Sequence, residues 1–178
     1  CKSEEARKIW FQLPQPPLTP LDSTRVAELE AILGVEVMRV FTPGVVDVGP
    51  RWNVAQLANA QQVLSVRPDL DRLKLRDIQL GTTGVVIFGE YPNETPALEV
   101  RAFAPVHGVN EDPVCGSGNA SVGAFIHHTG QISHFGNEFA ASQGAALGRA
   151  GFVHIAVSEQ FIRVGGAAVT CIDGYLST

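Results

Sequence analysis

The chain is poor in charge, above all basic charge, and it has no long apolar run. Only 17% of its 178 residues are charged, and 18 acidic against 13 basic side chains give a formal net charge of −5. A chain with so few basic residues lacks the general basic surface that attracts nucleic acid or anionic membranes. No stretch approaches the roughly 18 apolar residues of a membrane-spanning helix. We therefore expect neither nucleic acid nor a membrane among its partners.

Cysteine is also scarce, which bears on redox compartment and metal binding. The sequence contains three cysteines: Cys1, Cys115 and Cys171. Their odd number and wide spacing fit a reducing cytosol better than a disulfide scaffold, and no Cys-x-x-Cys pair suggests zinc. His127 and His128 point in different directions on a helix, so with His134 they do not predict a metal site. The charged first residues also lack the apolar segment of a secretory signal, so we expect a cytoplasmic protein. Because no metal-ligand pattern is present, we also expect no cofactor.

Short β-rich runs, separated by 18 glycines and 11 prolines, make up most of the chain. The predicted strands are Ala6–Leu13, Val35–Thr42, Thr83–Gly89, Ala97–Ala104, Gly151–Ser158, Gln160–Val164 and Ala167–Asp173. Helical spacing predicts one helix that begins at Asp22 or Ser23 and ends at Gly34, and another over about Asn53–Leu64. With 45% apolar residues and no long linker, residues 1–178 are expected to form a single domain.

A third predicted helix, Asn119–His128, is apolar or small on every side. Such a helix is normally buried all round. Gly123 in its interior costs roughly 1 kcal/mol of helix propensity, which close packing against another backbone would offset. In a chain made mostly of strands, the pattern predicts an α+β fold in which strands wrap around this central helix.

The N-terminal end of the central helix carries the candidate site. The first backbone N–H groups of a helix have no intrahelical partner and attract a carboxylate or phosphate. Gly116 and Gly118 let a ligand approach the main chain, and Ser117 adds a hydroxyl donor. The same field favours ionised Asp112 and is expected to lower the pKa of the Cys115 thiol. These residues suit proton transfer beside a bound carboxylate, but a plain helix cap, a buried cysteine and a turn aspartate explain them too.

Longer motifs around this site resemble a known family. Arg101–Pro105 (Arg-Ala-Phe-Ala-Pro) and Gly108–Gly118 (Gly-Val-Asn-Glu-Asp-Pro-Val-Cys-Gly-Ser-Gly) resemble the second-half signature of the PhzF-like isomerases of phenazine biosynthesis. Shorter segments extend the resemblance: Asp47–Trp52, Gln143–Gly144, Gly148–Arg149 and Val164–Gly166. The resemblance implies the diaminopimelate-epimerase-like fold, in which two similar halves each wrap strands around a central helix. The active site of that fold lies between the halves.

The resemblance also implies roles and a missing part. In such enzymes a glutamate of the first half shuttles a proton in an allylic isomerisation of a small cyclic acid. The second half positions the substrate, and that role would fall on Asp112, Gly116 and Ser117. The chain lacks the first half's Asn-Pro motif and its glutamate segment, so we expect a C-terminal domain, a fragment or one part of a split protein. Its last ten or so residues are expected to belong to the absent half.

Two other functions stay open. Related amino-acid epimerases and proline racemases use a catalytic cysteine in the loop where this chain has Cys115, although the Glu-Arg pair of diaminopimelate epimerases is replaced by Ala104–Pro105. The other alternative is a non-catalytic module that binds a small carboxylate or pairs with itself through the exposed half-cleft. An apolar strand within Ala167–Ser177 would lack a partner sheet, so we expect a homodimer or association with the missing half.

Overall fold

The computed structural model describes residues 7–92 and 94–175. Their strands form one ten-stranded sheet in the order β1-β10-β9-β8-β6-β5-β4-β3-β2, with β7 paired to β6. The strands are β1 (Arg7–Pro14), β2 (Leu18–Pro20), β3 (Gly44–Asp47), β4 (Arg51–Gln56), β5 (Gly84–Glu90), β6 (Leu98–Ala104), β7 (Val109–Asp112), β8 (Glu138–Gln143), β9 (Gly151–Val157) and β10 (Phe161–Ala168). The helices are α1 (Ser23–Leu33), α2 (Ala60–Ser65), α3 (Leu70–Leu80), α4 (Gly116–His128) and α5 (Ile132–Phe135), with 3-10 turns η1 (Pro105–His107) and η2 (Ala145–Leu147).

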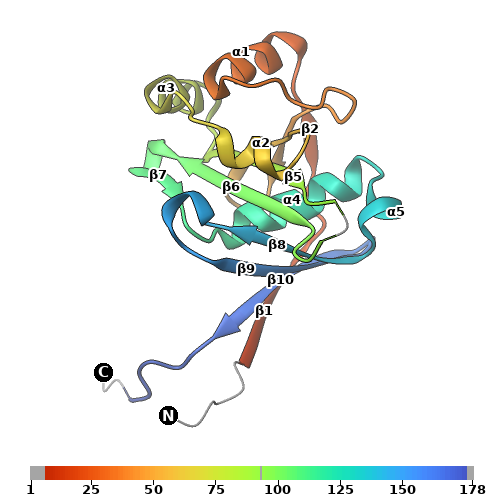
Figure 1. Cartoon of the computed structure of the whole chain (residues 1–178), viewed down its shortest axis with the longest axis vertical. Helices are drawn as coiled ribbons and strands as arrows, with labels where there is room; N and C mark the ends of the chain where they lie inside the picture. The colour runs from red at the N-terminus through yellow and green to blue at the C-terminus, as the bar shows by residue number, and fades with distance from the viewer. Residues whose placement is uncertain (1–6, 93, 176–178) are drawn as a thin grey trace.

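The sheet curls around α4, and Figure 1 shows this helix between β5–β6 on one side and β8–β10 on the other. Helix α4 contacts β9 and β10 as well as β2–β5. The predicted α+β architecture, with strands wrapped around a central helix, is therefore confirmed as a curled half-barrel. The curl brings sheet segments that are distant in sequence to the same helix, and this arrangement positions the site.

Packing explains why α4 is built from small residues. Phe125 is fully buried and stacks edge-on against Phe88 of β5, with 5.7 Å between ring centroids. On another face, a Cβ on Gly123 would lie 2.9 Å from a methyl of Ile155 and 3.4 Å from one of Ile162. The close contact expected at Gly123 is therefore with the side chains of β9 and β10 rather than with another backbone. The missing side chain at Gly123 leaves room for the isoleucine side chains of these two strands.

A second, outer layer covers the opposite face of β4–β6. Helices α1, α2 and α3 pack there around a separate apolar cluster that includes Leu29, Leu73, Ile87 and Phe103. Figure 1 shows α1 and α3 at the top of the molecule, with α2 lower down, where it contacts β5 and β6. None of the helices in the described part of the chain combines the length and the apolar character needed to cross a bilayer. The helix predicted to end at Gly34 is confirmed, and Asp22 caps it by accepting a hydrogen bond from the Arg25 N–H at 2.9 Å.

Strands β1 and β10 pair along their whole length and extend from the body as a two-stranded ribbon, with the paired residues Arg7 and Ala168 at its far end (Figure 1). Ile9, Trp10 and Phe11 on β1 remain 44–59% exposed. Strand β10 runs without interruption to Ala168, whereas two strands, Gln160–Val164 and Ala167–Asp173, were predicted. Residues 169–175 form neither helix nor strand, so the predicted last strand is wrong over most of its length.

Two predicted elements early in the chain are also wrong. Residues Val35–Thr42 form turns and not a strand, since the Glu30 carboxylate accepts from the Val37 N–H at 3.1 Å and pairs with Arg39. The helix predicted over Asn53–Leu64 is instead the end of β4 followed by α2. Strand β4 is buried on both faces, so its apolar run does not alternate and is ambiguous with a helix.

Several further elements were not predicted, among them α3, which carried clear signals, and β8, which did not. Asp69 caps α3 by accepting from the Arg72 N–H at 3.0 Å, and Gly81 ends that helix with φ of 62°. A capping aspartate before a periodic run and a glycine after it are ordinary helix boundaries. Strand β8 reads Glu-Phe-Ala-Ala-Ser-Gln and has no such boundary signal.

Candidate active site

The N-terminus of α4 presents two free backbone donors. Cys115 is the N-cap residue, in an extended conformation, and its Sγ accepts from the Gly118 N–H at 3.3 Å. The Asn119 N–H bonds to the Cys115 carbonyl at 3.0 Å. Within residues 7–92 and 94–175, the amides of Gly116 and Ser117 have no hydrogen-bond acceptor. These two N–H groups lie at the positive end of a 13-residue helix and can bind an anion.

Gln143, at the end of β8, fixes the loop that precedes the helix. Its Oε1 accepts from the Cys115 N–H at 3.1 Å and from Asn119 Nδ2 at 2.7 Å. Its Nε2 donates to the Asp112 carbonyl at 2.7 Å. One buried amide therefore joins β7, the cap and the first turn of α4. The next residue, Gly144, has φ of 93° and lies so close to Pro113 that an added Cβ would be 2.6 Å from its carbonyl oxygen.

Asp112 lies at the end of β7, partly buried, beside the cap. Its Oδ1 accepts from the Val114 N–H at 3.0 Å, which closes a short turn across Pro113. The structure thus brings Asp112 and Cys115 together at the helix terminus, as the sequence predicted. A turn aspartate makes this same hydrogen bond to the amide two residues on. The geometry therefore fits a purely structural role for Asp112 and also a role in positioning a substrate.

The environment of Cys115 differs from the expectation. Its side chain is only 6% exposed, and burial raises the pKa of the thiol above its ordinary value, whereas we expected the helix to lower it. Hydrogen bonds from Ser117 and from the Gly118 amide oppose this rise but are the smaller effect. The Ser117 Oγ lies 3.5 Å from Cys115 Sγ and accepts from Trp52 Nε1 at 3.0 Å. The thiol is therefore a buried capping group.

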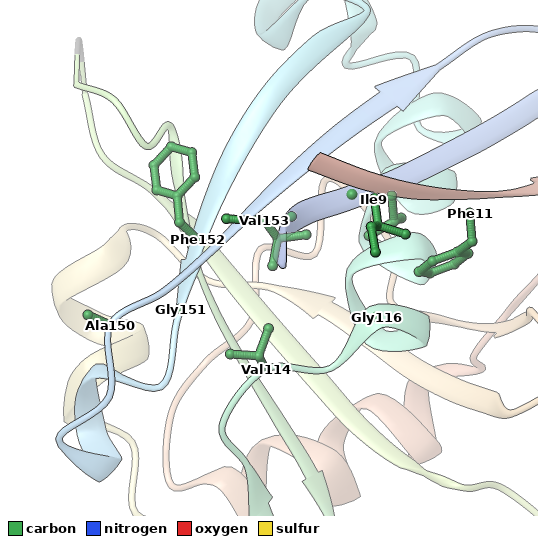
Figure 2. A pocket seen from close by; sticks show the side chains of 12 residues that line it. Ile9, Phe11, Val114, Gly116, Ala150, Gly151, Phe152 and Val153 are labelled. Atoms are coloured by element: carbon green, nitrogen blue, oxygen red, sulfur yellow. The ribbon is translucent and has the colours of Figure 1, made fainter. Parts of the chain in front are cut away.

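A pocket of about 400 Å³ opens beside the first turn of α4. Figure 2 shows its walls, where Phe11 and Ile9 of β1 face Gly116 and Val114, and Phe152 stands at the opposite side. A Cβ on Gly116 would lie 3.1 Å from the Phe11 ring, so glycine keeps this side of the pocket open. The lining is mostly apolar, as is usual for small-molecule sites.

Among the five residues singled out in the sequence, Gly116 lines this pocket. Asp112, at the end of β7, and Cys115, Ser117 and Gly118, in the cap and first turn of the helix, are not among its lining residues. Gly118 is buried, and a Cβ there would lie 3.1 Å from Cys115 Sγ. The glycine at 118 therefore makes room for the cap and not for a ligand.

Sequence reasoning gave no role in the site to three residues that organise it: Trp52, Asn119 and Gln143. Trp52 and Gln143 entered only through short segments that resemble the family. Trp52 and Gln143 come from β4 and β8, so their contacts depend on the curl of the sheet and have no local signal. Asn119 did have one, since it is a polar residue on an otherwise apolar helix and is fully buried. A buried amide needs partners, which could have suggested a network at this end of the helix.

The histidines near the end of α4 do not converge. His128 Nε2 lies 2.8 Å from the Pro16 carbonyl oxygen, and His134 Nε2 lies 2.9 Å from a carboxylate oxygen of Glu90. The nearest acid to His127 is Glu159, at 3.9 Å. In the described ranges, no three histidine, cysteine or acidic side chains gather as metal ligands would.

With this geometry in view, comparison with known proteins identifies the family. The family model described as phenazine biosynthesis-like protein, PhzC-PhzF, matches residues 1–174, and the chain belongs to this family. Over 92% of its length it is 36% identical to a Schizosaccharomyces pombe protein named as an uncharacterized isomerase, 94% of which it covers. It is 35% identical to the antisense-enhancing sequence 1 protein of the same organism, over 97% of this chain and 60% of that protein.

Solved structures agree with the fold. A PhzF-family protein from Bacillus anthracis superposes with a TM-score of 0.70 at 18% identity, over 89% of this chain and 57% of that chain. A predicted epimerase from Pseudomonas aeruginosa gives a TM-score of 0.68 at 20% identity, over 89% of this chain and 55% of that chain. The chain thus spans little more than half the length of these proteins and has the fold of one half of the PhzF, or diaminopimelate-epimerase-like, architecture.

Proposed function

We propose that the chain supplies half of the active site of a cofactor-independent isomerase that moves a proton on a small, carboxylate-bearing substrate. The observation that carries the proposal is a pair of amides, Gly116 and Ser117, that have no acceptor among the described residues and lie at the start of a 13-residue helix, beside an apolar pocket. Relatives in the family are named as isomerases or as a predicted epimerase, which supports this reaction class.

In this proposal the substrate carboxylate accepts hydrogen bonds from the Gly116 and Ser117 amides. Binding at a helix terminus stabilises negative charge, including the charge that develops when a proton leaves the neighbouring carbon. Phe11 and Val114 form an apolar wall that is about half exposed in this chain, and covering it with the other half would exclude water and strengthen these interactions. The Asp112 carboxylate borders the site, and by resemblance to the family a glutamate from the other half shuttles the proton.

The test is proton exchange in deuterium oxide, followed by NMR on a panel of small unsaturated and cyclic carboxylic acids. The chain is assayed alone and joined to the first half of a longer family member. Gly116→Ala places a Cβ 3.1 Å from the Phe11 ring and should reduce exchange. Gly174→Ala is the matched control, because a Cβ there meets nothing within 4 Å. No exchange with any acid in either form would count against an isomerase.

A Cys115-dependent epimerase is tested with Cys115→Ser. A serine hydroxyl caps a helix at least as well as a thiol, so the fold should be kept. Because the thiol is buried and its pKa is raised, we expect Cys115→Ser to keep most of the exchange activity. Loss of the activity, together with exchange at the α-carbon of a free amino acid, would establish the epimerase instead.

A second candidate function is binding without turnover, or self-association over the same pocket. It is supported by the exposed apolar side chains of Ile9, Trp10 and Phe11, which border the pocket or the ribbon beside it. Exposed apolar groups of this kind are commonly covered by another polypeptide. Light scattering that gives a mass of one chain at high concentration would argue against association, and saturable binding of a carboxylate without exchange would favour a binding module.

A further inference from the structure

A second cavity, of about 430 Å³, adjoins the candidate active site but differs from it in chemistry. The two cavities share Ala150, Gly151 and Phe152. Phe152 and Pro96 give the second cavity an apolar wall, while its polar lining comes from Tyr91, Glu94, Glu99, Ser142, Gln143 and Arg149. A cavity of this size, with an apolar wall and a few convergent polar groups, is typical of sites for small molecules.

Glu99 gives this cavity a buried carboxyl group. It lies on β6 directly opposite Ser142 of β8, and its side chain is 0% exposed. Its Oε2 accepts hydrogen bonds from the hydroxyl groups of Tyr91, at 3.1 Å, and of Ser142. Its Oε1 is buried, and none of the described residues donates to it. An unpaired buried oxygen of this kind is costly, so a donor from a ligand would relieve a real deficit.

The other charges around the cavity define what that ligand is. Glu94 at the edge adds a second negative charge, so a purely anionic ligand is disfavoured and an ammonium group is favoured. Arg149, exposed at the edge, has no acidic partner within 4 Å among residues 7–92 and 94–175. Its guanidinium is free to pair with a carboxylate. The apolar wall at Phe152 suits an apolar group on a ligand that carries both an ammonium and a carboxylate group.

We propose that this cavity is a binding site for a free amino acid with an apolar side chain. The ammonium group donates to Glu99 Oε1, the carboxylate pairs with Arg149, and the side chain packs against Phe152 and Pro96. The site is distinct from the α4 terminus, and occupancy does not require the proposed isomerase. The two sites are in physical contact, since Gln143 lines this cavity and also bonds to the Cys115 N–H and the Asp112 carbonyl.

The test uses three probes that share one ring and differ only in charge: L-phenylalanine, 2-phenylethylamine and 3-phenylpropanoate. Each is titrated into the ¹⁵N-labelled chain, and amide shifts at Tyr91, Glu99 and Ser142, which line this cavity and not the first, report binding here. We expect the amino acid and the amine to saturate these shifts, and the acid to bind at least about tenfold more weakly, because it offers nothing to Glu99. This comparison needs no variant. Equal binding of all three, or no saturable binding of the amine, overturns the proposal.

Variants then assign the contacts. Glu99→Gln removes the charge at nearly constant volume, and should weaken the amine by about tenfold or more. Arg149→Gln should weaken L-phenylalanine by only a few-fold, because the guanidinium is exposed and its ion pair is screened, and should leave the amine unchanged. Arg72→Gln, at an exposed position of α3, is the control. If Glu99→Gln leaves the affinity for the amine unchanged, Glu99 is a structural carboxyl group and the proposal is wrong.

Discussion

Asp77 gives the sharpest prediction about stability, because its carboxyl group is buried on the side of the molecule away from the candidate site. It lies on α3 and is 0% exposed. Its Oδ1 accepts from Thr82 Oγ1 at 2.7 Å and from Asn53 Nδ2 at 3.2 Å, and Arg76 Nη1 lies 3.7 Å away. Burial outweighs these contacts and raises the pKa of Asp77 from its ordinary 3.8 to about 6.

The sign follows from which state binds the proton more tightly. The folded chain holds the Asp77 proton more firmly than the unfolded chain, so the stabilising contribution is present at low pH and is lost as pH rises through about 6. At about 1.4 kcal/mol for each tenfold change in proton affinity, the contribution amounts to roughly 3 kcal/mol. Asp77→Asn removes the ionisation, and any loss of packing or hydrogen bonding in that variant does not depend on pH.

The assay is urea unfolding between pH 4 and pH 7.5, followed by the fluorescence of buried Trp52. The free energy of unfolding of Asp77→Asn relative to the wild type should rise by roughly 3 kcal/mol across this range. Asp71→Asn, at an exposed position of the same helix, should show no such trend. The opposite slope, with Asp77→Asn losing stability as pH rises, would refute the reasoning and show that Arg76 holds Asp77 ionised.

Three further predictions follow from packing and burial. Phe125→Ala removes a fully buried ring from α4 and should lower the free energy of unfolding by about 3–5 kcal/mol in the same urea assay. In a Cys1→Ser background, iodoacetamide should label exposed Cys171 at least about a hundredfold faster than Cys115, and urea should abolish the difference, as peptide mass spectrometry would show. Gly165→Ala would place a Cβ 2.4 Å from the Trp10 ring, and should speed hydrogen exchange of the β1 amides; unchanged exchange would contradict this close pairing of β1 and β10.

The central helix was predictable from sequence because its signal is compositional. A helix without a polar face must be buried, and α4 needed no knowledge of its neighbours to be placed at the centre of the sheet. Strands β5 and β6 were similarly clear. The segment from Val35 to Leu64 was not, because β4 is buried on both faces and therefore lacks alternation. Only the pairing of β4 with β3 and β5 distinguishes it from a helix.

In the candidate site, too, some features were predictable from the sequence and others were not. The cap, the glycines and the aspartate were visible because they occupy consecutive positions, Asp112–Gly118, at a helix start. The contacts of Gln143 and Trp52 with this site were not visible, because each residue reaches the site from a strand far along the chain. The direction of the Cys115 pKa shift was predicted wrongly for the same reason. The electrostatic field of a helix can be inferred from the local sequence, whereas desolvation of the thiol depends on every residue that packs around it.

The three glycines of α4 show how one sequence pattern serves both the fold and the site. At Gly123, the missing side chain admits methyl groups of β9 and β10, so that glycine belongs to the core. At Gly118, it admits the Cys115 cap and a methyl of Val86. At Gly116, it leaves space under the Phe11 ring, beside the pocket and an amide that has no acceptor in the described chain. The small residues that let the strands pack closely around α4 thus also leave the backbone at its N-terminus accessible to a ligand.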